Sequence, residues 1–325
     1  MQVTDAVPDP RAPLPANVAV SRENHLVTRP KSRASAKGDR LAAWVFVAPN
    51  LIFYLLFIVI PALTGVVLSF YSWDLFTSPK FVGLANYRTL MHDPLVVTSL
   101  EHSLMFVVLG VVPTMMLGFV FAALLDWQIR TIGAIRLLYF LPLVVSTAVA
   151  GVLWSTLFSS STGMVNRALD LVGIKGPEWL ASTTWALPAL TVVIIWISLP
   201  LVIILYLAGL QRVPQQIYEA ARIDGAGVWV RLWGITWPNV RATTMLVIVL
   251  EILQFLALPL EIGLIMTHGG PLDATTSISF YAYRQAFELG NMGFASAISM
   301  AQFFALLAIV ATVAATIRRL GRPRA

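Results

Sequence analysis

Cysteine is absent from the 325-residue sequence, and charged residues are scarce at 12%. The absence of cysteine excludes disulfides, thiolate metal ligands and cysteine nucleophiles. An ordinary soluble domain carries about 25% charged residues, and the 22 Lys and Arg with 16 Asp and Glu here are too few to cover a soluble protein of this length. Because 58% of the residues are apolar and the mean hydropathy is +0.79, the composition predicts a membrane protein.

The motifs that hold ATP or a metal ion are also absent. None of the four lysines follows a glycine, so the sequence contains no phosphate-binding P-loop. The four histidines lack the spacing of a metal site or a hydrolase triad. We therefore expect no catalytic residue, no metal and no cofactor bound by this chain. The histidines are His25, His92, His102 and His268.

Long apolar stretches dominate the remainder of the chain. A helix needs about 20 apolar residues to cross a bilayer, and six stretches of the sequence reach that length. Several contain Pro or Gly, which membrane helices tolerate when neighbouring helices satisfy the freed backbone groups. The sequence predicts an all-α polytopic membrane protein with six transmembrane helices and short surface helices in the loops 159–184 and 266–293. The spans are 42–70, 103–125, 135–158, 185–210, 240–265 and 294–317.

The basic residues predict the orientation. Residues 1–40 are polar and carry seven of them, so we expect a disordered tail. No apolar region of a signal peptide lies near Met1. Counting alternate loops, 17 Lys and Arg fall on the side of both termini and 5 on the other. The positive-inside rule therefore predicts that both termini, including the tail 321–325, are cytoplasmic. Since these residues border the spans, the net charge of +6 does not indicate a nucleic-acid partner.

The segment 211–239 between the fourth and fifth spans is the most informative. Pro214 can open a helix, and Gly225 with Gly227 can close one. In that helix Ile217, Ala220, Ala221 and Asp224 fall on one side, and we expect the exposed alanine pair to let another protein approach closely. The residues are QQIYEAARIDG.

A second short helix is expected over about 228–235, ending before Pro238. Two short helices joined at a glycine turn would form a rigid cytoplasmic knob. An amphipathic helix lying on lipid headgroups is the alternative, because Trp229, Trp233 and Trp237 suit the membrane interface.

The spacing of this loop carries a family resemblance. Glu219-Ala220-Ala221, Gly225 after three residues, and the later Ile235 and Pro238 resemble the EAA loop of binding-protein-dependent ABC importer permeases, E-A-A-x-x-x-G-x(9)-I-x-L-P. Only the leucine departs, because Trp237 replaces it. Asp224-Gly225-Ala226 resembles the carbohydrate branch, the MalF-like permeases for maltose and glycerol-3-phosphate. Over residues 41–320, four further stretches agree: FVGLANY at 81–87, THGGP at 267–271, YAY at 281–283 and GFASA at 293–297.

This resemblance implies the MetI-like transmembrane domain of an ABC importer that moves a sugar or sugar-like solute inward by alternating access. The loop helix would be the coupling helix, with Glu219 and Gly225 as motif positions. The implied partners are a second homologous permease, two ATP-binding subunits that hold ATP and Mg, an extracytoplasmic solute-binding protein and membrane lipid. The chain itself would not be an enzyme.

Three polar residues lie within the fifth span. Glu251, Gln254 and Glu261 share one stripe at 100° per residue, and an ionised carboxylate in a bilayer normally faces a cavity or a partner. Glu251 and Gln254 are candidates for a polar solute lining; interhelical hydrogen bonds, or a protonated Glu251 against the partner permease, are equally open. For Glu261, a structural role is favoured.

Aromatic residues of the fourth span, Trp196 and Tyr206, could stack on sugar rings, although membrane packing is the commoner role of such residues. Other solutes remain open, above all glycerol-3-phosphate and glycerophosphodiesters. Two other classes are an ion-driven secondary transporter, which the lack of an internal repeat disfavours, and a lipid-modifying membrane enzyme, which the lack of a His/Asp cluster disfavours.

Overall fold

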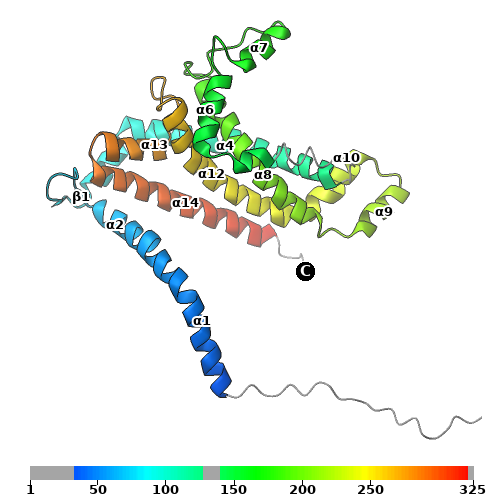
Figure 1. Ribbon diagram of the computed structural model, residues 1–325, viewed down its shortest axis with the longest axis horizontal. Helices are drawn as coiled ribbons and strands as arrows, with labels where there is room; N and C mark the ends of the chain where they lie inside the picture. Colours follow the sequence, from blue (N-terminus) through cyan, green and yellow to red (C-terminus); the bar gives the residue numbers. More distant parts are fainter. Residues whose placement is uncertain (1–32, 127–139, 321–325) are drawn as a thin grey trace, which may run out of the picture. The chain divides into compact units, whose positions relative to one another are not determined.

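The structure is a computed structural model, and it describes residues 33–126 and 140–320 (Figure 1). Residues 1–32 of the predicted tail 1–40, the predicted tail 321–325, and residues 127–139, which include the first residues of the third predicted span, lie outside the described residues. The chain divides into two compact units, residues 1–59 and 60–325. The described elements are helices apart from one two-stranded hairpin.

The first unit contains one long helix. Helix α1 spans Arg33–Tyr54 and is followed by the π-helical turn η1, Leu55–Val59. The helix begins at Arg33, within the segment 1–40 that the sequence predicted to be disordered. Its first turns are polar and contain Ala, Lys and Arg, which have high helix propensity. The helix therefore begins before the apolar residues of the first predicted span, which starts at residue 42.

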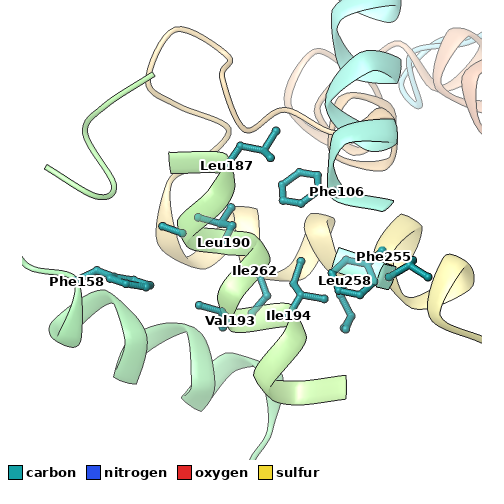
Figure 2. Close-up of a cluster of buried hydrophobic side chains, with 11 residues drawn as sticks. Phe106, Phe158, Leu187, Leu190, Val193, Ile194, Phe255, Leu258 and Ile262 are labelled. Carbon is teal, nitrogen blue, oxygen red and sulfur yellow. The ribbon is translucent and has the colours of Figure 1, made fainter. Parts of the chain in front are cut away.

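Three long helices form the core of the second unit. Helices α4, Pro94–Asp126, and α8, Ala186–Leu210, run in the same direction, and α12, Arg241–Met266, runs against both. One apolar cluster joins Phe106, Ile194 and Phe255 (Figure 2). A second cluster joins the other halves of the same helices through Phe119, Tyr206 and Val247.

The last helix closes the other side of the second unit. Helix α14, Met292–Leu320, packs on α2, Ile60–Leu68, and on α3, Ala85–His92. It also packs on α13, Ile278–Tyr283, and on the π-helical turn η3, Arg284–Glu288. The antiparallel hairpin β1, Tyr71–Ser72, and β2, Lys80–Phe81, precedes α3.

Five helical segments of the described chain are long and apolar enough to cross a membrane, so the predicted spans are confirmed at five places: Trp44–Leu68, Pro94–Leu125, Ala186–Leu210, Arg241–Met266 and Met292–Thr312. The third predicted span, 135–158, is represented by helical residues 140–144 and by α6, Thr147–Leu157. These 11 residues of α6 are too few to span a bilayer by themselves. A short helix is present in each of the two predicted loops, as α7, Met164–Leu171, and as α13. The expected surface position is wrong for α13, because four of its six residues are buried against neighbouring helices.

Candidate functional site

The loop between α8 and α12 presents helix α9, Gln215–Ile223, at one end of the bundle (Figure 1). Pro214 stands at its N-cap with φ −59° and ψ 131°. A proline fits this end because the first N–H groups of a helix have no intrahelical acceptor. The predicted helix and its start signal are therefore confirmed.

Gly225 ends α9 as the sequence predicted. Its φ is +75°, a left-handed conformation that glycine adopts at low cost. The Gly225 N–H donates to the Arg222 carbonyl at 3.1 Å, and the Ala226 N–H donates to the Ala221 carbonyl at 2.9 Å. These two bonds form a Schellman motif, which satisfies the last carbonyls and stops the helix sharply. No atom lies within 4 Å of a Cβ built on Gly225, so backbone conformation, not space, requires the glycine.

The two alanines of the motif have different surroundings, so the predicted exposed pair is wrong. Ala220 is exposed, whereas Ala221 is only 7% exposed. The reason is the helical phase: Ala221 lies one turn from Tyr218, on the side that packs inward. Ile217, Glu219, Asp224 and Gly225 are exposed. Ile223 is 87% exposed and adds an apolar contact surface that the sequence reasoning missed.

Tyr218 connects α9 to the segment that leads into α12. Its hydroxyl donates to Thr236 Oγ1 at 3.2 Å. Thr236 ends the π-helical turn η2, Arg231–Thr236, which lies between α10, Val228–Val230, and α11, Trp237–Asn239. The second short helix was expected to end before Pro238, but helical structure continues to Asn239. Pro238 is tolerated because it falls in the first turn of α11, directly after the wider π turn.

Aromatic rings then join this segment to the bundle. Trp237, the one departure from the EAA pattern, contacts Phe119 of α4 edge-on, with ring centroids 4.9 Å apart. Trp233 and Tyr206 also pack on Phe119, at 5.7 Å and 5.6 Å. These rings connect the segment between α9 and α12 to α4 and α8.

The polar residues of α12 have unequal exposure. Glu251 is 1% exposed, and its Oε2 has no hydrogen-bond partner among the described residues. Gln254 is half-buried, and Glu261 is exposed. The shared stripe therefore does not give the three side chains the same surroundings.

The two aromatic candidates of α8 are engaged by other side chains. Tyr206 is 0% exposed, and its hydroxyl donates to Thr244 Oγ1 at 3.3 Å. Trp196 is half-buried and packs edge-on against Trp154 at 5.9 Å. A sugar could not reach the Tyr206 ring without displacing the core around Phe119, so in this arrangement Tyr206 serves packing.

A cavity of about 430 Å³ lies elsewhere, among α2, α12, α13, η3 and α14. The Ser279 hydroxyl is hydrogen-bonded to the Gln302 amide at 2.9 Å and donates to the Leu256 carbonyl at 2.9 Å. Hydroxyl and amide groups beside apolar surface suit a sugar, which has both kinds of face. Its polar lining consists of Ser279, Tyr283, Ser296, Ser299 and Gln302.

Sequence reasoning missed this cavity, although two signals pointed toward it. Tyr283 comes from the YAY stretch and Ser296 from the GFASA stretch, both of which had already matched the carbohydrate branch. The residues of these two stretches are apolar or weakly polar, as in many membrane helices. Only the packing of α13 against α14 shows that some of them line a cavity.

A polar network ties the bundle end opposite α9. Tyr281 donates to Asp93 Oδ2 at 2.6 Å, and Gln285 donates to the Tyr281 hydroxyl at 2.8 Å. Burial, and then the hydrogen bond to Asp93, raise the pKa of Tyr281 to about 12. Asp93 also accepts from the Leu95 N–H at 2.9 Å, at the first turn of α4. Arg284 pairs with Asp273 at 2.6 Å.

Known proteins share this architecture. A crystal structure of a bacterial alginate ABC transporter in complex with an alginate pentasaccharide-bound periplasmic protein aligns with a TM-score of 0.76 at 23% identity, covering 89% of this chain and 98% of that one. The chain therefore has the fold of an ABC importer permease, an integral membrane protein.

Sequence relatives identify the family. The probable ABC transporter permease protein YurN of Bacillus subtilis is 31% identical over 276 residues, 83% of this chain and 94% of its own length. The trehalose/maltose transport system permease protein MalF of Thermococcus litoralis is 31% identical over 286 residues, 88% of this chain and 95% of its own. No family model matches the sequence. The chain belongs to the ABC transporter permease family.

Proposed function

We propose that the chain is one permease subunit of an importer that carries a sugar or sugar-like solute into the cytoplasm of a prokaryote by alternating access. The α9 end would face the cytoplasm, with both termini, because the basic residues gather on that side. Its partners would be a second permease, two ATP-binding subunits and a solute-binding protein. ATP and Mg would be bound by the ATP-binding subunits.

Helix α9 carries this proposal. It is a short helix with a Schellman end, most of its surface is exposed, and a hydrogen bond from Tyr218 ties it to Thr236 of η2. Such a helix can enter a cleft on another protein without unfolding. Ile217, Glu219, Ala220 and Asp224 would contact the ATP-binding subunit, with Ile223 as an added apolar contact.

The cavity beside α14 supports a neutral, hydroxyl-rich solute. Its lining contains serine, tyrosine and glutamine but no Lys or Arg. A glycerophosphate would need a cation to offset its charge, so the sugar is preferred over the glycerol-3-phosphate alternative. We place Ser279 and Gln302 on the solute pathway, with Gln254 as a further candidate and Glu251 and Trp196 as less accessible ones. Tyr206 is left out because its ring is enclosed in the core beside Phe119.

Reconstituted transport tests this function. The chain would be purified with the subunits that accompany it, placed in liposomes and supplied with ATP and a solute-binding protein loaded with a chosen sugar. We expect sugar-dependent ATP hydrolysis and uptake, and at least a tenfold loss of both in Glu219→Lys. Lys80→Glu, a charge reversal in the β2 strand away from α9, is the matched control. Uptake driven by an ion gradient without ATP would refute the proposal.

A further inference from the structure

Glu251 sits in a polar layer between the two apolar clusters of the bundle. Contacts between the helices show which residues lie at the same height along the bundle as Glu251. Helices α4 and α12 run in opposite directions, and Gly110 of α4 abuts the Phe255 ring of α12. One turn further along each helix, toward the α9 end, are Thr114 and Glu251, which therefore lie level with each other.

Helix α8 contributes to the same layer. Gly118 of α4 abuts Val202 of α8, and because these helices run in the same direction, one turn back brings Ser198 level with Thr114. Thr114, Ser198 and Glu251 are 0%, 2% and 1% exposed, so three helices each place one polar side chain in a closed layer.

The layer has many hydrogen-bond acceptors and few donors. Glu251 Oε2 and Ser198 Oγ have no partner among the described residues, while the Thr114 hydroxyl is already donated to the Gly110 carbonyl at 2.8 Å. Pro113 and Pro200 lie beside the layer, and each removes a helical N–H donor and leaves a carbonyl without its usual partner. The Ser198 hydroxyl offers one donor, and a proton on the Glu251 carboxyl would supply a second.

No positive charge offsets an ionised Glu251 at this level. Among the described side chains, α6, α8, α11, α13 and α14 over Met292–Thr312 carry no Lys, Arg or His, and the His102 imidazole of α4 lies 12 residues before Thr114 and contacts the Thr276 carbonyl. The other titratable side chains described on the elements packed against α12 are Glu101, Tyr206, Tyr281 and Tyr283. The cations Arg231 of η2 and Arg241 of α12 lie toward the α9 end, and Arg241 is ten residues before Glu251. An unpaired buried carboxylate costs several kcal/mol, about 2.5–3.5 on insertion scales.

We propose that Glu251 is a proton-binding site: the closed packing of α4, α8 and α12 holds its carboxyl in the neutral, protonated form. A proton is favoured over a metal ion, since a hard cation takes about six or more oxygen ligands and this layer has fewer side-chain oxygens. Water reaching the layer would stabilise the carboxylate, so separating the three helices releases the proton. The site thus links helix packing to pH, independently of which solute is carried.

Infrared spectroscopy tests this directly. The full chain, with the subunits that accompany it, is placed in lipid nanodiscs at about pH 7. The wild type is expected to have a carbonyl band of a protonated carboxyl that Glu251→Gln removes. Glu261→Gln is the matched control, because Glu261 lies on the same helix but is exposed, and this variant keeps the band. A wild-type spectrum without such a band, or a band unchanged in Glu251→Gln, overturns the proposal.

The pH dependence of unfolding gives a second measurement. A carboxyl that binds its proton more tightly when folded stabilises the protein at low pH and loses that contribution as pH rises. The wild-type thermal midpoint should therefore fall between about pH 5 and about pH 9, and Glu251→Gln should lose at least half of that fall. If the glutamine variant does not fold, Glu251→Met, an apolar side chain of similar length, replaces it. A fall fully retained in the variant, or a wild-type midpoint that rises with added Na⁺ instead, contradicts proton binding.

Discussion

The two ends of the bundle are held in different ways. At the α9 end, one side-chain hydrogen bond from Tyr218 and the buried Ala221 fix a helix whose other residues are exposed. At the opposite end, Asp93, Tyr281, Gln285 and Asn291 form a continuous chain of hydrogen bonds that joins α4 to α13 and η3. Under the proposed function, the α9 end leaves most of its surface exposed for a partner, whereas the opposite end uses its polar groups in hydrogen bonds within the chain.

The largest change is expected from Gly225→Pro. Proline fixes φ near −65°, which is incompatible with the +75° of Gly225, and it removes the N–H that donates to the Arg222 carbonyl. We expect loss of most uptake with normal membrane insertion, measured by reconstituted transport and by surface expression. Gly227→Ala is the control, since Gly227 has φ −64° and open space around it. Equal uptake by both variants would contradict a role for the Schellman end.

At the other end, Asp93→Ala should have the largest effect on stability. It removes the acceptor at the first turn of α4 and leaves the buried Tyr281 hydroxyl without its carboxylate partner. These losses together are worth about 2–4 kcal/mol, measured as a lower thermal midpoint in nanodiscs. Asp93→Asn retains one carbonyl oxygen and should lose less than Asp93→Ala. If both variants unfold at the wild-type midpoint, the network does not stabilise this end.

Tyr281→Phe tests the end opposite α9 through the pH dependence of the protein's stability. Because the folded pKa of Tyr281 is raised to about 12 from an ordinary value of about 10, its stabilising contribution is complete below about pH 10 and is lost as pH rises toward about 12. The wild type should lose stability over that alkaline range, and the variant should lose less. Tyr283→Phe on the same helix is the control. An alkaline loss of the same size in Tyr281→Phe would rule out this tyrosine as its source.

The smallest effect is expected from Tyr218→Phe at the α9 end. The hydroxyl makes one partly buried hydrogen bond, to Thr236, worth about 0.5–1.5 kcal/mol. Global stability should hardly change, while ATP-driven uptake falls a few-fold because α9 is held less firmly. Uptake and ATP hydrolysis in the same liposomes would separate weaker coupling from loss of protein. Wild-type uptake in this variant would mean that the aromatic contacts alone transmit the motion.

The sequence by itself determined the membrane-spanning helices, the family and helix α9 with its glycine end. These features depend on local patterns: apolar runs, charge between them, and spacing within one turn. The sequence could assign Gly225 as the end of α9 because a glycine just after a helical segment is a local stop signal. Its positive φ is the conformation that this stop requires.

Only the tertiary structure decided which face each helix presents. Ala220 and Ala221 are adjacent residues of the same type, but Ala220 is exposed and Ala221 is buried. Glu251 and Glu261 lie on the same helix, but Glu251 is buried and Glu261 is exposed. The cavity of Ser279 and Gln302 joins residues from α13 and α14 that no local pattern connects. The physical reason is that apolar helices in a bilayer have no polar face that shows which side packs, so close contacts such as Gly110 against Phe255 set the rotation.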